Sequence, residues 1–287
     1  MDRADTTLNG QVIVITGSTS GIGRAAAMEL ARKGARLVLV ARDPKRADDV
    51  LAELRDIDPR QNHTALLGDL SLMRETARIG AEIAATEPRV DVLINNAGAM
   101  YPDRQVTPEG LERTFALNHM SYFVLTRTLL DRIPSGGRIV NTASEAHRGG
   151  RLDLSNLQSA QRYSAFRTYS MTKLANILFT RELARRTGDA GVRANCHHPG
   201  VVASRLFNNS KGVLRVLFAI GRLVMISSEK GAETLVYLAS SAEVASDSGG
   251  YYSQCRPRRS TDQARDETTA RGLWDESERI VASILGR

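Results

Sequence analysis

Tyr169 and Lys173 are the residues whose types and spacing point most directly to chemistry: they lie four positions apart in the pentapeptide YSMTK. On a helix this spacing places a phenol and an ammonium on one face. The pKa of a free tyrosine is about 10, too high for a base at neutral pH. A nearby cation favours the phenolate and lowers that pKa. The pair is therefore a candidate general acid and base for hydride transfer to or from a carbonyl. The same spacing also occurs by chance on many helices.

Two further polar residues lie at informative positions. Ser144 follows the apolar run 137–142, where its hydroxyl could hydrogen-bond a substrate oxygen. Asn118 lies inside a helical pattern over 108–130, although asparagine is unfavourable in a helix interior. We therefore expect a bound water or a broken helical turn at Asn118. Taken alone, each of these two residues would be interpreted as structural.

A glycine-rich segment, TGSTSGIG over residues 16–23, separates the first apolar run from the first helical pattern. Glycines let the backbone approach a pyrophosphate closely, and a helix N-terminus presents free N–H groups to it. A glycine-rich turn alone is a weak signal, but here it stands between strand and helix, where phosphate binding needs it. The segment therefore predicts a dinucleotide site. It is not a P-loop, because no Gly-Lys-Ser/Thr follows.

The end of the second apolar run bears on the choice between NADP and NAD. An enzyme that selects NAD places Asp or Glu there to bind the ribose 2′-hydroxyl. This chain has Ala41 and then Arg42, which leave room for a 2′-phosphate and offer a guanidinium to bind it. The sequence favours NADP(H), with NAD(H) as the alternative because a shift of one position would bring Asp43 toward the ribose.

Two other strand ends carry candidate cofactor contacts. Asp69, followed by Leu70, could accept a hydrogen bond from the adenine amino group or could cap the helix that starts near Leu72; the pattern leaves both roles open. The segment 95–98, Asn-Asn-Ala-Gly, closes the fourth apolar run, and its backbone could pack beneath the cofactor.

Apolar runs alternate with helical patterns along the chain, without a linker or repeat. We predict strands over 11–16, 36–41, 63–67, 90–95, 137–142, 192–197 and 250–253, and helices over 24–33, 44–57, 72–86, 108–130, 163–187, 229–239 and 272–285. Most runs lack polar alternation, as expected of parallel strands covered on both faces. The prediction is a single α/β Rossmann domain over 1–287, a doubly wound sheet of seven parallel strands. Ligands bind such sheets at the carboxyl ends of the strands.

Composition excludes several other classes. The 287 residues include 39 basic and 32 acidic side chains, but the arginines are scattered and cluster only at Arg256, Arg258 and Arg259. Nucleic-acid binding would require a concentrated basic stripe. No run reaches the about 18 uncharged apolar residues that a membrane-spanning helix needs. Two cysteines rule out a disulfide framework and a four-cysteine zinc site. We expect a cytoplasmic protein.

Together these motifs resemble the short-chain dehydrogenase/reductase family over nearly the whole chain. TGSTSGIG is similar to the cofactor loop of that family, NNAG to its fourth-strand motif and YSMTK to its YxxxK pair. The segments RIVNTASEAH, KLANILFTREL and HPGVV are most similar to the retinol dehydrogenase and WW-domain-oxidoreductase-like branch, for which the resemblance implies NADP(H).

The resemblance implies a catalytic tetrad of Asn118, Ser144, Tyr169 and Lys173. Tyr169 would exchange a proton with the substrate oxygen while hydride moves to or from the nicotinamide, and Ser144 would orient that oxygen. Lys173 would hold the ribose and lower the pKa of the tyrosine. Asn118 would anchor a water of the proton relay.

The resemblance also extends the cofactor site to HPGVV, beside the nicotinamide, where Ser204 replaces the threonine common in the family. The expected cofactor-binding residues are Gly17, Ser18, Thr19, Ser20, Gly21, Ile22, Gly23, Arg42, Asp69, Leu70, Asn96, Ala97, Gly98, Tyr169, Lys173, Pro199, Gly200, Val202 and Ser204. No metal is expected, because the adjacent His197 and His198 would face opposite ways on a strand.

The segment 204–228 is the expected substrate loop. Its part 213–226 has apolar residues at helical spacing, with Arg215 and Arg222 on one side. It could be a lid over a bulky apolar carbonyl or alcohol substrate, a subunit contact, or a helix for peripheral membrane contact. By family likeness, helices 108–130 and 163–187 would pair in a homodimer or homotetramer. A non-catalytic NADP-binding sensor or scaffold is the alternative function.

Overall fold

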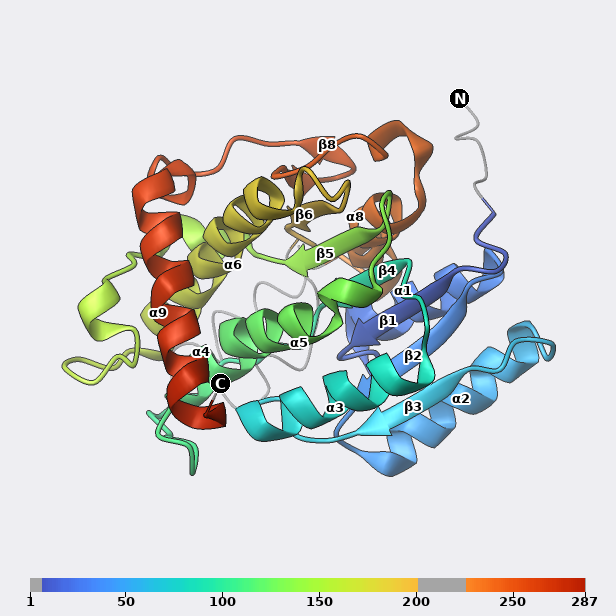
Figure 1. Ribbon diagram of the computed structural model, residues 1–287, viewed down its shortest axis with the longest axis horizontal. Helices are drawn as coiled ribbons and strands as arrows, with labels where there is room; N and C mark the ends of the chain where they lie inside the picture. Colours follow the sequence, from blue (N-terminus) through green and yellow to red (C-terminus); the bar gives the residue numbers. More distant parts are fainter. Residues whose placement is uncertain (1–6, 201–225, 287) are drawn as a thin grey trace.

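The structure, a computed structural model, describes residues 7–200 and 226–286. One sheet in the order β3-β2-β1-β4-β5-β6-β7-β8 forms its centre (Figure 1). The strands are β1 Val12–Thr16, β2 Arg36–Ala41, β3 Thr64–Leu67, β4 Val92–Asn95, β5 Arg138–Thr142, β6 Arg193–His197, β7 Tyr251–Ser253 and β8 Arg256–Pro257. The seven predicted strands are present and pair in parallel. The chain order reverses between β1 and β4, and this is the crevice at which such sheets bind ligands.

The described sheet has an eighth strand, so the predicted number of seven is wrong. β8 is only two residues long and pairs antiparallel with β7. The turn between them places Gln254 and Cys255 at φ values of 54° and 56°. Tight hairpin turns with positive φ usually carry Asn or Gly, and neither stands here. The turn and the short polar strand therefore leave no recognisable signal in the sequence.

Helices cover both faces of the sheet (Figure 1). Their bounds are α1 Gly21–Arg32, α2 Pro44–Ile57, α3 Met73–Thr86, α4 Arg113–Phe115, α5 Ser121–Leu129, α6 Ala165–Thr187, α8 Ser228–Ser240 and α9 Glu267–Leu285. Alternate residues of one strand face opposite layers: Val14 of β1 joins the hydrophobic cluster with α3, α5, α6 and α9, whereas Ile13 and Ile15 join the cluster with α1, α2 and α8. None of the helices in the described ranges is long and apolar enough to cross a membrane.

The predicted continuous helix over 108–130 is wrong. Glu112 ends the preceding loop, and its carboxylate accepts hydrogen bonds from the backbone N–H groups of Thr114 and Phe115 at 2.9 and 2.7 Å. This cap starts α4 five residues later than predicted. A π-helical turn over Ala116–Met120 then separates α4 from α5. The break expected at Asn118 is therefore confirmed.

The C-terminal helix α9 runs along α6 and also packs against α3 (Figure 1). It begins five residues before the prediction because the carboxylate of Asp266 caps it by accepting from Thr269 N at 2.8 Å. Trp274, 9% exposed, stacks on Phe179 of α6 and meets Phe123 of α5 edge-on, at centroid distances of 5.9 and 4.9 Å. α9 therefore covers parts of the two helices that were expected to pair between subunits.

Candidate active site

The glycine loop between β1 and α1 depends on the absence of side chains. A Cβ at Gly17, where φ is +68°, would lie 2.8 Å from the Cα of Ala97, and a Cβ at Gly23 would lie 2.2 Å from the carbonyl oxygen of Gly17. At Gly21, φ is +54° and nothing lies within 4 Å of the Cβ position. The loop is thus packed tightly on its inner side and open at Gly21.

The N-terminus of α1 is available to an anion. Its N-cap residue, Ser20, makes no side-chain hydrogen bond to the helix, so the first N–H groups keep no side-chain acceptor. The buried hydroxyl of Ser18 has no hydrogen-bond partner among the described residues. Together with the open space at Gly21, these groups fit the pyrophosphate of a dinucleotide.

The end of β2 lies beside this loop. Arg42 is exposed, whereas the carboxylate of Asp43 accepts a hydrogen bond from Arg46 N at 3.1 Å and so caps α2. The Asp43 carboxylate, which complicated the choice of cofactor, is therefore used by the helix, whereas the exposed guanidinium of Arg42 hydrogen-bonds to the Tyr101 side chain.

Asp69 follows β3, but its predicted alternative role as the cap of α3 is wrong. Its Oδ1 accepts hydrogen bonds from the N–H and hydroxyl of Ser71, at 2.9 and 2.7 Å. The first N–H groups of α3, those of Met73 and Arg74, instead donate to the carboxylate of Glu109. A residue 36 positions away in sequence from Met73 thus supplies the cap. The adenine contact of Asp69 stays a prediction.

The NNAG segment joins the glycine loop to the catalytic residues. Asn96 donates from Nδ2 to the carbonyl oxygens of Thr16 and Gly17, at 3.1 and 3.3 Å. At Gly98, a Cβ would lie 3.2 Å from Asn118 Oδ1 and 3.5 Å from Lys173 Nζ. The missing side chain of Gly98 therefore lets these two side chains come together beneath the loop.

The amide of Asn118 ties the end of the NNAG loop to α6. Its Oδ1 accepts from Ala99 N at 2.8 Å, while its Nδ2 donates to Ala99 O at 2.9 Å and to Thr172 Oγ1 at 3.0 Å. π-helical turns like the one that holds Asn118 occur frequently at functional sites. The side chain is fully buried and positions two elements; its predicted contact with a water stays a prediction.

Tyr169 and Lys173 lie on one face of α6, as predicted, with Lys173 Nζ 5.6 Å from the Tyr169 ring centre. Lys173 is 3% exposed, and its ammonium donates to the carbonyl oxygen of Thr142 at 3.0 Å. Ser144 lies two residues beyond the end of β5; its hydroxyl bonds to that of Tyr169 and thereby lowers the pKa of the tyrosine. The structure therefore brings all four predicted catalytic residues together.

The predicted acidic phenol is not present in this structure. Burial raises the pKa of Tyr169 to about 12, more than the Ser144 hydroxyl lowers it, and burial lowers the pKa of Lys173 to about 7. Both shifts have one cause, because low-dielectric surroundings disfavour the charged form of each group. Tyr169 and Lys173 lie beside each other as expected, but burial changes the pKa of each side chain more than its neighbours do.

The carboxyl end of β6 contributes the remaining predicted segment. His197 is buried, and its Nε2 lies 3.1 Å from the hydroxyl of Thr142. His198 turns the other way and accepts from Glu145 N at 3.2 Å. Pro199 and Gly200 follow, half-buried, with φ of +91° at Gly200. Val202, Ser204 and the segment 213–225 lie outside the described residues.

Sequence reasoning missed two residues of this site. Thr142 accepts hydrogen bonds at its carbonyl from both Lys173 and Asn176, the second at 3.1 Å; a backbone acceptor carries no residue-type signal. Tyr122 lies with its ring 6.0 Å from Lys173 Nζ. Its spacing of four from Asn118 on a helical pattern could have indicated a shared face.

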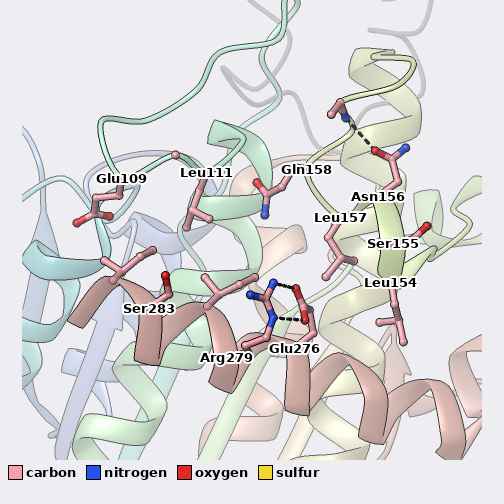
Figure 2. A pocket seen from close by; sticks show the side chains of 14 residues that line it. Glu109, Leu111, Leu154, Ser155, Asn156, Leu157, Gln158, Glu276, Arg279 and Ser283 are labelled. Carbon is pink, nitrogen blue, oxygen red and sulfur yellow. Dashed lines mark hydrogen bonds and ion pairs between the residues drawn. The ribbon is translucent and has the colours of Figure 1, made fainter. Parts of the chain in front are cut away.

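A surface cavity of 390 Å³ lies apart from the tetrad, between α9, the turn at Gly110 and the loop that contains Asn156 (Figure 2). The ion pair of Glu276 and Arg279 forms part of its wall, at 2.5 Å. None of the four catalytic candidates lines this cavity, so it is not part of the candidate active site.

Comparisons with known proteins agree with this geometry. Residues 11–215 match the family model of the short chain dehydrogenases. The chain is 38% identical to retinol dehydrogenase 14 of Mus musculus, over 97% of this chain and 87% of that protein. A crystal structure from Mycobacterium Paratuberculosis superposes with a TM-score of 0.79 at 29% identity, over 98% of this chain and 97% of the other.

A further solved structure, a blue fluorescent protein from a metagenomic library in complex with NADPH, has a TM-score of 0.69 at 27% identity. The match covers 85% of this chain and 96% of that one. The protein belongs to the short-chain dehydrogenase/reductase family of oxidoreductases, and to its retinol dehydrogenase-like branch.

Proposed function

We propose that the protein is an NADP(H)-dependent oxidoreductase that transfers hydride between nicotinamide and a carbonyl or alcohol group of a bulky apolar substrate. The observation that carries the proposal is the meeting of the Tyr169 and Ser144 hydroxyls above the Lys173 ammonium, next to the glycine loop. The whole chain would act as one dinucleotide-binding domain.

The residues at the end of β2 support NADP(H) over NAD(H). Ala41 is small, Arg42 is exposed, and the Asp43 carboxylate is engaged at the start of α2. A guanidinium can bind a 2′-phosphate through two parallel hydrogen bonds. The structurally similar NADPH complex adds to this argument.

Two observations support an apolar substrate. Phe166 is 51% exposed one helical turn before Tyr169, so it presents a large aromatic ring near the catalytic phenol. Retinol dehydrogenase 14, a relative of this chain, is named for a long apolar alcohol. Exposed aromatic rings contribute large apolar contact areas to ligand binding.

In the proposed reaction, three residues of the chain would each have a separate role beside the bound cofactor. Bound NADPH would supply the hydride, and NADP⁺ would accept it in the opposite direction. Tyr169 would give its phenolic proton to the substrate oxygen in reduction and take it back in oxidation. Ser144 would hold that oxygen by a hydrogen bond. The Lys173 ammonium would stabilise the phenolate as the proton leaves.

The test is NADPH oxidation with a panel of aldehydes and ketones that ranges from acetone to retinal, in parallel with NADH. We expect turnover to favour NADPH and the larger apolar carbonyls. Tyr169→Phe should lower kcat by about 10²–10⁴-fold, the usual contribution of a proton donor. NADPH binding without turnover of any carbonyl would favour a sensor or scaffold, and unchanged activity of Tyr169→Phe would refute the assigned donor.

A further inference from the structure

Tyr122, on α5, has a hydroxyl that ordinary packing does not explain. The residue is 1% exposed and sits in the hydrophobic cluster between the sheet and α3, α5, α6 and α9. Among the described residues its hydroxyl oxygen makes no hydrogen bond of ordinary geometry, although the side chain of Thr142 lies close enough to lower its pKa. A buried polar group without a partner costs about 1–3 kcal/mol, and phenylalanine would fill the same space without that cost.

The surroundings of this hydroxyl connect it to the catalytic lysine. Lys173 Nζ lies 6.0 Å from the centre of the Tyr122 ring and 5.6 Å from that of Tyr169. An ammonium has three N–H donors, but within the described residues that of Lys173 makes one hydrogen bond, to Thr142 O. A buried ammonium with unused N–H groups and the ring of a tyrosine whose hydroxyl lacks a well-formed hydrogen bond thus lie near each other, both next to Thr142.

The titratable groups that face Lys173 come from three elements. Tyr169 lies on its own helix, Tyr122 on α5 and His197 on β6. Burial lowers the pKa of His197 to about 3, so this imidazole is neutral at physiological pH. Burial also raises the pKa of Tyr122 well above its ordinary value, so its phenol is neutral too. Within the described residues no carboxylate offsets the burial of the ammonium.

We propose that Tyr122 is a further positioning residue of the active site, whose hydroxyl accepts a hydrogen bond from the Lys173 ammonium through a bridging water and keeps that ammonium protonated and in place. Water-bridged hydrogen bonds are nearly as favourable as direct ones. The protonated lysine is the form that stabilises the Tyr169 phenolate, so the inference rests on the proposed function for its catalytic meaning. The hydroxyl acts on the reaction only through Lys173.

The test exploits the small number of lysines: Lys33, Lys45, Lys173, Lys211 and Lys230. Full-length protein labelled with ¹³C at the lysine Cε would be titrated by NMR, with Lys173→Met to assign the signal. In Tyr122→Phe we expect the pKa of Lys173 to fall by about 0.5–1 unit, the equivalent of one hydrogen bond. Superimposable titrations of wild type and Tyr122→Phe would overturn the proposal.

A second readout measures the consequence for catalysis. Because a lysine of lower pKa is less protonated and stabilises the Tyr169 phenolate less, the rising limb of kcat/KM for alcohol oxidation should move to higher pH. Below that limb, Tyr122→Phe should be about 3–10-fold slower. A shift in the titration without a matching shift in this limb would also contradict the proposal, since Lys173 would then not carry the effect to Tyr169.

Two controls separate positioning from structure. Losing one water-bridged hydrogen bond should cost Tyr122→Phe at most about 1 kcal/mol of stability, so the variant stays folded in the assay and lost stability cannot account for lost rate. Tyr237 lies on α8, in the opposite layer, and its phenol donates to Glu243. Tyr237→Phe should leave the titration of Lys173 as in wild type. The NMR titration requires no turnover, so a failure to find any substrate would refute the proposed function without touching the link between Tyr122 and Lys173.

Discussion

The ammonium of Lys173 donates to the carbonyl oxygen of Thr142 at 3.0 Å, and this hydrogen bond fixes α6, the helix of the candidate catalytic pair, to the end of β5. Asn176, one turn further along the helix, donates to the same oxygen at 3.1 Å. Ser144 follows Thr142 by two residues, so the carbonyl that holds the lysine also sets the position of the hydroxyl beside Tyr169. The register of α6 against β5 therefore determines how Ser144, Tyr169 and Lys173, the candidate catalytic residues, lie relative to one another.

Burial of Lys173 makes stability depend on pH. The folded pKa is about 7 and the unfolded value is 10.5, so between these values the unfolded chain holds a proton that the folded chain lacks. The free energy of unfolding therefore rises with pH in this window. Lys173→Met removes this slope: the variant should be more stable than wild type at pH 6.5, and the difference should shrink by on the order of 2–3 kcal/mol by pH 9.5.

Urea unfolding at half-unit pH steps would measure that difference. Lys230→Met is the matched control, because Lys230 is exposed and paired with Glu233 at 2.7 Å; its difference from wild type should be flat over the same range. A constant difference between wild type and Lys173→Met would mean that the folded lysine titrates near its ordinary pKa.

Gly23 supports the cofactor loop through close backbone contact. A Cβ there would lie 2.2 Å from the carbonyl oxygen of Gly17, a backbone atom that cannot move without displacing the loop. We expect Gly23→Ala to weaken NADPH binding by at least tenfold and to lower stability by about 1–3 kcal/mol, the usual cost of overpacking. Fluorescence titration with NADPH and urea unfolding would measure the two effects.

Gly188→Ala is the control for Gly23→Ala. At Gly188 a Cβ would make an ordinary contact of 3.4 Å at the exposed end of α6. Alanine there should leave NADPH affinity unchanged. If Gly23→Ala bound NADPH as tightly as this control does, the loop would not be the phosphate site.

In the proposed function, Arg42 binds the 2′-phosphate of NADPH and so selects this cofactor over NADH. Arg42→Ala should raise the Kd for NADPH by roughly 10–100-fold, because a hydrogen bond between charged groups contributes about 1.5–3 kcal/mol. Affinity for NADH, which lacks the 2′-phosphate, should change little. Arg55→Ala removes an exposed guanidinium from α2 and should leave both affinities as they are. An equal loss for both cofactors would indicate that Arg42 supports the fold rather than reads the phosphate.

The strands and the glycine loop could be predicted because their signals lie in short, continuous stretches of the sequence. Apolar runs without alternation predict buried parallel strands, and each of the seven predicted runs contains a strand. The glycines were informative because no other residue fits where backbone atoms lie too close for a Cβ, as at Gly17 and Gly23. The spacing of Tyr169 and Lys173 likewise fixed their shared face.

What could not be predicted depends on residues distant in sequence. The cap of α3 comes from Glu109 rather than Asp69, because the fold brings a carboxylate from a later loop to that helix end. The pKa of Tyr169 followed burial rather than its neighbouring cation, because spacing reveals which residues are adjacent but not how deeply they are buried. Thr142 acts through its carbonyl, which every residue type possesses.

Trp274 anchors α9 to α5 and α6, the helices beside the candidate active site. Its ring packs on Phe123 and Phe179, and the guanidinium of Arg186 lies 4.4 Å from the ring centre. Truncation to alanine would leave a cavity among these groups and remove the cation–π contact. We expect Trp274→Ala to lower the free energy of unfolding by about 3–5 kcal/mol, measured by urea unfolding. Arg271→Ala, on the exposed side of the same helix, should change it by less than about 0.5 kcal/mol. Equal effects of the two variants would show that α9 is held by its surface charges rather than by this aromatic contact.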